Sequence, residues 1–117
     1  MIGIDIVEIA RIQKLNMDDF ANKILCQSEK AYLETKLRKA ETLAGFFAAK
    51  EAVSKALGSG FTKDVTHKDI EVLHDECGAP ICNLHGKAKE ILMQNGKEIY
   101  ISVSHDGGYA AAVAMIK

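Results

Sequence analysis

The sequence predicts an α+β fold in which one small antiparallel sheet is wrapped by helices. Segments with the two-residue alternation of β-strands lie near both ends of the chain, at residues 1–8, 98–105 and 109–116. Residues 41–57 instead have the apolar spacing of one long helix. Terminal strands with helices between them are typical of the α+β class.

The first half of the chain is predicted to be mostly helical after its opening strand. Residues 11–15 form a short helical turn, and residues 18–25 form a helix with its apolar residues on one side. Ser28 is expected to cap a third helix that reaches about residue 38, because its hydroxyl can accept a hydrogen bond from a first-turn amide. Gly58 should end the central helix in a left-handed conformation.

The second half begins with a loop at residues 59–68 and continues as two hairpins around a short helix. Strands at 70–74 and 81–84 are joined by the turn sequence Cys77-Gly78-Ala79-Pro80, and a helix follows at 86–94. Asp106-Gly107-Gly108 is a strong hairpin signal between the last two strands. The first strand is expected to pair with the last, whose run of alanines predicts close packing against a helix.

Size and composition indicate one globular domain over residues 1–117. The net charge of −1 excludes a global electrostatic attraction to nucleic acid. No apolar run approaches the roughly 18 residues that a membrane span needs, and the N-terminus does not resemble a signal peptide. The three cysteines, Cys26, Cys77 and Cys82, form no CxxC pair, which favours free thiols and a cytoplasmic location.

Two carboxylates are the strongest candidates for a metal site. Asp5 interrupts an apolar strand, and Glu51 lies on the central helix. A strand carboxylate and a helix carboxylate can together hold Mg²⁺, which takes few protein oxygens and leaves room for phosphate and water. The alternative is that Asp5 faces solvent and that Glu51 forms an ordinary ion pair with Lys55, four residues further on.

The central helix is expected to have one buried face and one face that carries chemistry. Glu51 and Lys55 are about 40° apart on the helical wheel. Next to a metal-bound phosphate, the Lys55 amine would neutralise developing charge, although a solvated lysine near a helix end is the simpler interpretation. Ser54 and Phe47 share this face, and the core face carries Phe46, Ala49, Val53, Ala56 and Leu57.

Other polar residues are weaker candidates. His105 could bind a phosphate or another polar group, or could simply bond to backbone near its turn. Gly58 and Gly60 allow a ligand to approach the backbone closely, and they equally suit a helix stop. Arg11 and Lys14 could attract an acidic partner or form a solvated basic edge. His67, His74 and His85 have no partners at a recognisable spacing.

Three segments together resemble the holo-[acyl-carrier-protein] synthases, the small 4′-phosphopantetheinyl transferases. They are Gly3-Ile4-Asp5-Ile6-Val7-Glu8, the helix Phe47-Ala48-Ala49-Lys50-Glu51-Ala52 continued by Ser54-Lys55-Ala56-Leu57-Gly58, and Val103-Ser104-His105. Their order and spacing agree with the family, so the resemblance covers nearly the whole chain.

The resemblance implies a Mg²⁺-dependent transfer of phosphopantetheine from coenzyme A to a serine of apo acyl carrier protein, in fatty acid biosynthesis. Adenosine 3′,5′-bisphosphate would be released. Asp5 and Glu51 would hold the Mg²⁺, and Lys55 would contact the phosphates and assist the leaving group. These three residues would be the catalytic set, and either Glu51 or a metal-held water would take the serine proton.

The same resemblance implies binding surfaces and an assembly. Ser54, Lys55, Gly58, Gly60 and His105 would bind coenzyme A. The basic side chains of the first helical turn, Arg11 and Lys14, would receive the acidic carrier protein. Family members of this size are homotrimers with active sites between subunits.

One position departs from the family pattern. Phe46 occupies a place where the family often has a basic residue, which removes one charged contact to coenzyme A or carrier. Two other functions are compatible with the residues: a catalytically silent binding module that kept the fold, and a metal-dependent phosphohydrolase that uses the same carboxylates.

Overall fold

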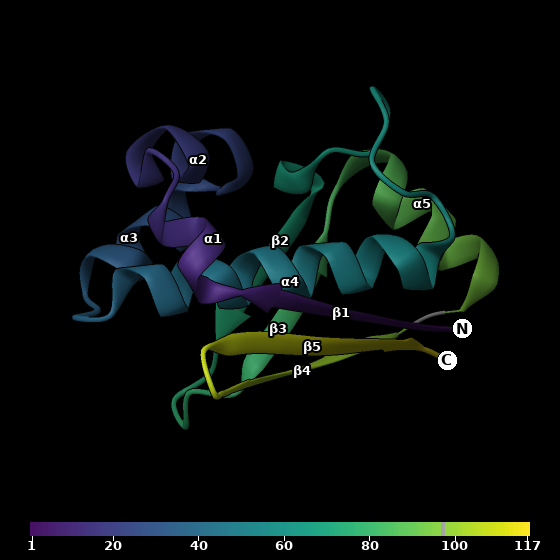
Figure 1. Cartoon of the computed structure of the whole chain (residues 1–117). Coiled ribbons are helices and arrows are strands. Elements are labelled where there is room, and N and C mark those ends of the chain that lie inside the picture. Colours follow the sequence, from purple (N-terminus) through teal and green to yellow (C-terminus); the bar gives the residue numbers. More distant parts are fainter. Residues whose placement is uncertain (97) are drawn as a thin grey trace.

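The computed structural model describes residues 1–96 and 98–117. Its termini lie side by side, and the Met1 amine donates a hydrogen bond to the Ile116 carbonyl at 3.2 Å (Figure 1). The elements run in the order β1 (Ile2–Glu8), α1 (Ile9–Gln13), α2 (Met17–Ile24), α3 (Gln27–Glu34), α4 (Lys39–Leu57), the 3₁₀ turn η1 (His67–Asp69), β2 (Ile70–His74), β3 (Pro80–Leu84), α5 (Gly86–Asn95), β4 (Ile99–Asp106) and β5 (Tyr109–Ile116).

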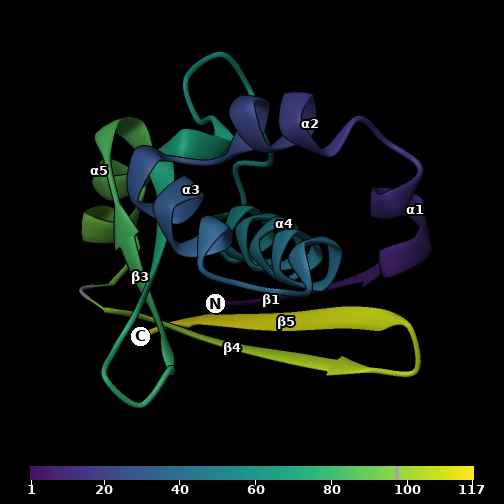
Figure 2. The same cartoon turned by 90° about the vertical axis from the view of Figure 1, so that its left-hand side faces the viewer.

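The expected α+β class is confirmed, and the strands of the described residues form two small antiparallel sheets. The larger sheet has the order β1-β5-β4 (Figure 2), and the smaller one pairs β2 with β3. The expected pairing of the first strand with the last is confirmed, with Asp5 opposite Ala112 in the register. β5 is therefore the central strand of this sheet, and its apolar side chains must pack against another element on one face.

Helix α4 supplies that cover and lies along the three-stranded sheet (Figure 1). Small residues on β5 let it come close, because Ala110, Ala112 and Ala114 are all buried beneath it. On β1, a side chain at Gly3 would place its Cβ only 2.1 Å from the Ala52 carbonyl oxygen. The backbones of β1 and α4 are therefore in direct contact at Gly3. The close packing against a helix that the alanines of β5 predicted is confirmed.

The expected core face of α4 is confirmed, and the helix is buried on more than that face. Phe46, Ala49, Val53, Ala56 and Leu57 are all buried. Ser54 was expected beside Glu51 on the open face, and this expectation is wrong because only 2% of Ser54 is exposed. The chain turns back after Gly58 in the left-handed conformation, and the amides of Ser59 and Gly60 bond to the Ser54 carbonyl.

The start of α3 also differs from the expectation. Its N-cap is Cys26 rather than Ser28, and the Glu29 carboxylate accepts a hydrogen bond from the Cys26 amide at 2.7 Å. The Ser28 hydroxyl donates instead to the Glu71 carboxylate, a stronger acceptor supplied by β2. The helix ends at Glu34, four residues earlier than expected.

Two expectations about the whole chain can be compared with the described residues. Cys26, Cys77 and Cys82 are free thiols, as the sequence suggested. Across residues 1–96 and 98–117, no helix is both long and apolar enough to cross a bilayer.

Candidate active site

Asp5 and Lys55 meet where β1 crosses α4. Strand alternation turns Asp5 toward the helix, on the same face as Gly3 and Val7, and leaves its side chain only 17% exposed. The Lys55 Nζ donates to Asp5 Oδ1 at 3.1 Å and to the Ile4 carbonyl at 3.0 Å. Lys55 thus pairs with a strand carboxylate 50 residues away. The alternative, an ion pair between Lys55 and Glu51 within the helix, is not formed.

Glu51 lies one turn before Lys55 and is half-buried, with 26% of its side chain exposed. Burial raises the pKa of the Glu51 carboxyl, the negative charge of Asp5 raises this pKa further, and Lys55 lowers it. The two carboxylates are thus close enough to repel one another. One lysine cannot neutralise both, which leaves an excess negative charge at the contact of β1 with α4.

His67 is the side chain that contacts Glu51. Its Nε2 lies 3.4 Å from Glu51 Oε1, a long hydrogen bond. The imidazole is stacked on Phe61, at 3.7 Å between ring centroids, and more loosely on Phe47 at 5.9 Å. Burial and the positive charges of Lys50 and Lys23 lower the pKa of His67 to about 4, so the ring is neutral at neutral pH. It therefore adds no positive charge to offset the carboxylates.

This donor set fits Mg²⁺. Asp5 and Glu51 provide half-buried oxygens with uncompensated negative charge, and hard cations prefer oxygen ligands. Among the described residues, no group of three or more His, Cys, Asp or Glu side chains is arranged to hold a metal ion. A cation held by two protein carboxylates would complete its coordination with phosphate oxygens and water, as Mg²⁺ commonly does.

His105 belongs to a different part of the surface. Its Nε2 is 2.9 Å from the Glu41 carbonyl, and the ring packs against Gly45, where a Cβ would lie 3.0 Å from Nε2. Gly45 precedes Lys55 by ten residues, about 15 Å along a helix axis. The structure therefore does not bring His105 to Asp5 and Lys55 within one chain.

A cavity of about 240 Å³ lies beside His105. Phe46, only 3% exposed, forms part of its wall and meets the rings of Tyr32 and His74 edge to face. Tyr32 and His74 themselves stack at 3.9 Å. Aromatic surface thus lines this side of the cavity.

The glycines after α4 form an open turn next to Lys55. Gly58 and Gly60 both have left-handed backbones, with φ of 73° and 59°, and no atom lies within 4 Å of where a side chain would begin. The Ser54 hydroxyl donates to the Glu51 carbonyl at 2.8 Å, so it is turned toward the helix backbone. Ser54 can therefore support this turn through its carbonyl, while its hydroxyl is already engaged.

Arg11 on α1 and Lys14 directly after it are both exposed. This exposure is compatible with either a solvated basic edge or a surface for an acidic partner. Ile9 and Ile12 on the opposite side of this short helix are buried and fix it to the core. The two basic side chains are therefore held on the surface by a firmly packed turn.

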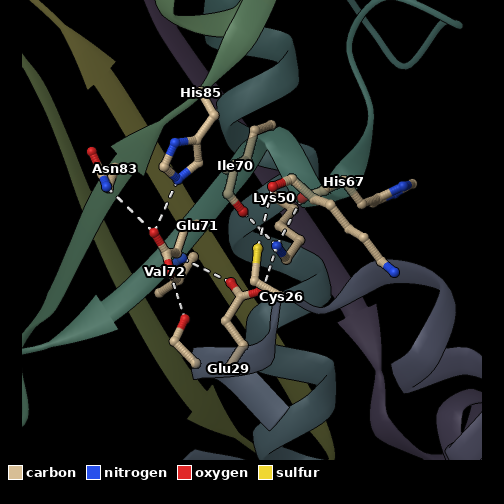
Figure 3. A network of polar contacts seen from close by, with 11 residues as sticks. Cys26, Glu29, Lys50, His67, Ile70, Glu71, Val72, Asn83 and His85 are labelled. Atoms are coloured by element: carbon tan, nitrogen blue, oxygen red, sulfur yellow. Dashed lines mark hydrogen bonds and ion pairs between the residues drawn. The ribbon is translucent and has the colours of Figure 1, made fainter.

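Sequence reasoning missed a buried ion pair next to the site. Lys50 and Glu29 are completely buried, and Lys50 Nζ lies 2.9 Å from Glu29 Oε1 (Figure 3). The same ammonium donates to the carbonyls of His67, at 2.8 Å, and Ile70. Glu29 Oε2 accepts from the Val72 amide at 2.8 Å. This network joins α3 and β2 to α4 one residue before Glu51.

A second carboxylate of this region predicts how stability depends on pH. Glu71 accepts hydrogen bonds from His85 and Asn83 (Figure 3). It also accepts one from the Ser28 hydroxyl, and chiefly this bond lowers the pKa of Glu71 below its ordinary 4.5. A lowered folded-state pKa gives stability above the unfolded-state value that disappears as the pH falls through the folded-state pKa. Glu71→Gln should therefore cost about 1–2 kcal/mol of unfolding free energy at pH 7.

Urea unfolding of the unsubstituted protein and of Glu71→Gln at several pH values measures this effect. The difference between them should be constant above pH 5 and shrink below about pH 4.5. A difference that stayed unchanged down to pH 3 would show that the Glu71 charge does not stabilise the fold.

Comparisons with known proteins show the family of the chain. A family model described as the 4′-phosphopantetheinyl transferase superfamily matches residues 1–114. A holo-[acyl-carrier-protein] synthase of Clostridium botulinum is 48% identical over 118 residues, which covers 99% of this chain and 95% of the relative. A second, from Caldanaerobacter subterraneus, is 43% identical over 97% of this chain and 91% of its own length.

Solved structures give the same result. The holo-[acyl-carrier-protein] synthase of Helicobacter pylori, crystallised in complex with coenzyme A, superposes with a TM-score of 0.87 at 38% identity over the full length of both chains. The Neisseria meningitidis enzyme superposes with a TM-score of 0.86 at 33% identity, over 97% of this chain and 94% of its own.

The match to the family model and to these relatives over nearly the whole chain shows that this α+β protein is a phosphopantetheinyl transferase. The chain belongs to the 4′-phosphopantetheinyl transferase superfamily and, within it, to the holo-[acyl-carrier-protein] synthases. Its activity is the transfer of phosphopantetheine to an apo acyl carrier protein.

Proposed function

We propose that this enzyme takes phosphopantetheine from coenzyme A, requires Mg²⁺ and releases adenosine 3′,5′-bisphosphate. Its product, a holo acyl carrier protein, would serve fatty acid biosynthesis in the cytoplasm. The observation that supports the proposal most is the ion pair of Asp5 with Lys55, next to a second carboxylate, Glu51, that the charge of Asp5 repels. The coenzyme A in the Helicobacter pylori complex supports the choice of donor.

Each residue of this site has a separate task in the proposed reaction. Asp5 and Glu51 would hold the Mg²⁺, which when bound supplies positive charge against a diphosphate. The Lys55 ammonium, already at the edge of the site, would neutralise charge on the leaving phosphate. Transfer at phosphorus depends mostly on such positioning and charge neutralisation. Two acceptors are compatible with the geometry for the proton of the carrier serine: the Glu51 carboxylate and a water.

The remaining contacts to substrate are proposed on the surfaces next to this site. The open turn at Gly58 and Gly60 adjoins Lys55 and would lie along coenzyme A, held by the Ser54 carbonyl. His105 would contact another part of the same molecule. Arg11 and Lys14 would receive the acidic carrier, because opposite charge steers such encounters.

We propose that residues 1–117 act as one domain and assemble as a homotrimer with active sites between subunits. Within one chain, about 15 Å of α4 separates His105 from Lys55, and a site between two chains would bring these residues from different subunits to one coenzyme A. The outer face of the larger sheet is also apolar. Ile2, Ile4 and Ile6 on β1 are 65–70% exposed there, and Met115 on β5 is 42% exposed.

Ile4→Asp should convert the assembly into single chains and reduce transfer by about a hundredfold or more, because a charge on this face would have to be buried between subunits. Sedimentation velocity measures the mass, which should fall from three chains to one. Met93→Asp on α5, equally exposed but outside the sheet, should change neither mass nor activity. An Ile4→Asp protein that still sediments as three chains would contradict an interface at this face.

One experiment tests the proposed function. The protein is incubated with coenzyme A, Mg²⁺ and an apo acyl carrier protein, and the carrier is weighed by mass spectrometry. A gain of one phosphopantetheine, abolished by EDTA and restored by Mg²⁺, is the expected result. Binding without a gain in mass would indicate a silent binding module, and breakdown of coenzyme A without carrier would indicate a phosphohydrolase.

A further inference from the structure

We propose that His67 is a positioning residue for Glu51, and that its Nε2–H orients the carboxylate that binds the divalent cation. This inference rests on the proposed metal role of Glu51. It concerns a side chain that lies 16 residues beyond Glu51 and reaches it from the end of the loop before β2.

Two aromatic rings pack against the His67 ring. Phe61 stacks on it with an interplanar angle of 16°, and Phe47 lies against it at 21°. These two aromatic side chains come from the loop after α4 and from α4 itself. A flat ring stacked in this way has little freedom to turn its edge away from Glu51.

The backbone of His67 is fixed as well. Its carbonyl accepts a hydrogen bond at 2.8 Å from Lys50 (Figure 3), the residue that directly precedes Glu51. The short turn that carries it is closed by Asp69, whose carboxylate accepts from the Thr66 amide at 2.9 Å. Neighbouring residues of α4 therefore hold the main chain and the ring of His67 at the same time.

The chemistry of the contact defines its direction. An ionised carboxylate can only accept hydrogen bonds, so the ring nitrogen facing Glu51 Oε1 must carry the proton. A carboxylate with one oxygen engaged in this way presents the other to a cation in a restricted orientation. Partners of this kind behind a metal ligand typically change metal affinity by about 10–100-fold when they are removed.

Two substitutions separate the hydrogen bond from the stacking. His67→Phe keeps a flat ring against Phe61 and Phe47 and removes the donor, whereas His67→Gln keeps an N–H donor without the ring. Calorimetric titration with Mn²⁺ in the presence of coenzyme A measures cation affinity directly. His67→Phe should bind Mn²⁺ about tenfold more weakly. His67→Gln should lie closer to the unsubstituted protein.

Steady-state kinetics adds a readout that a purely structural role would not change. His67→Phe should need a higher Mg²⁺ concentration for half-maximal rate, while its kcat at saturating Mg²⁺ stays within about threefold. Circular dichroism melts of both variants check that the fold is retained. Unchanged Mn²⁺ affinity in a folded His67→Phe protein, or equal weakening in both variants, would overturn the assignment.

A measurement on the unsubstituted protein avoids any dependence on the variants. Nitrogen-15 spectra of the imidazole without metal should show His67 protonated at Nε2. Protonation at Nδ1 alone would overturn the inference and leave the proposed function intact. If the unsubstituted protein bound no divalent cation at all, the proposed metal site would fail, and the role of His67 would fail with it.

Discussion

Glu51→Gln is expected to lower the rate of phosphopantetheine transfer by about a thousandfold while the protein stays folded. The substitution keeps the shape of the side chain and removes the negative charge that, with Asp5, would hold the cation. Loss of one group that stabilises charge in a transition state typically costs about 10²–10³ in rate. The mass gain of apo acyl carrier protein over time, with coenzyme A and Mg²⁺, measures the effect.

The fold should not suffer, because the Glu51 charge opposes folding. A raised pKa means that the folded protein holds this proton more tightly than the unfolded chain does, so ionisation above pH 4.5 favours unfolding. The Tm of Glu51→Gln at pH 7 is therefore expected at or above that of the unsubstituted protein. A glutamine in place of Glu90, an exposed residue of α5, is the matched control and should change neither property. Normal transfer by folded Glu51→Gln would refute the site.

Lys50→Met should have the largest effect on stability. It leaves the Glu29 carboxylate buried without its cation, and breaking a buried pair by removing one partner costs about 3–5 kcal/mol. It also leaves the carbonyls of His67 and Ile70 without this donor. For a chain of this length, the Tm should fall by roughly 10–20 °C, and urea unfolding followed by circular dichroism measures the free energy.

The double variant Lys50→Met with Glu29→Gln distinguishes the ion pair from simple loss of packing. Glutamine can still accept from the Val72 amide, so the double variant removes the isolated charge and should recover part of the lost stability. If the stability loss of the double variant equalled the sum of the losses of Lys50→Met and Glu29→Gln, the two charges would not interact. Lys39→Met, which removes a half-exposed lysine at the start of α4, is the control and should cost much less.

Local sequence signals were sufficient to predict most elements of the fold. The two-residue alternation of apolar side chains predicted the first and last residues of β2 and β5 correctly. Gly58 ends α4 as expected. The errors came from competition between side chains. Ser28 is a good cap in isolation, but Glu71 of β2 lies close enough to take its hydroxyl, and this contact spans 43 residues. The third helix therefore starts after Cys26 and not after Ser28.

The candidate site was only partly predictable for the same reason. Asp5 and Glu51 stood out as carboxylates in apolar surroundings, and Lys55 followed from helical spacing. That Lys55 pairs with Asp5 depends on how closely β1 approaches α4, which no local pattern contains. One missed residue did leave a signal, since Lys50 lies four residues after Phe46 and three before Val53, on the buried stripe. His67 left none.

Gly3 shows how far the demands of the site extend beyond the residues that would touch substrate. A single methyl group at this position would collide with the main chain of α4 and push the first strand outward, and Asp5 would move with it. The loss would appear in a mutational screen as a catalytic defect, although Gly3 has no functional group to contribute. Substitutions at Gly3 are thus excluded by the close approach of the β1 and α4 main chains.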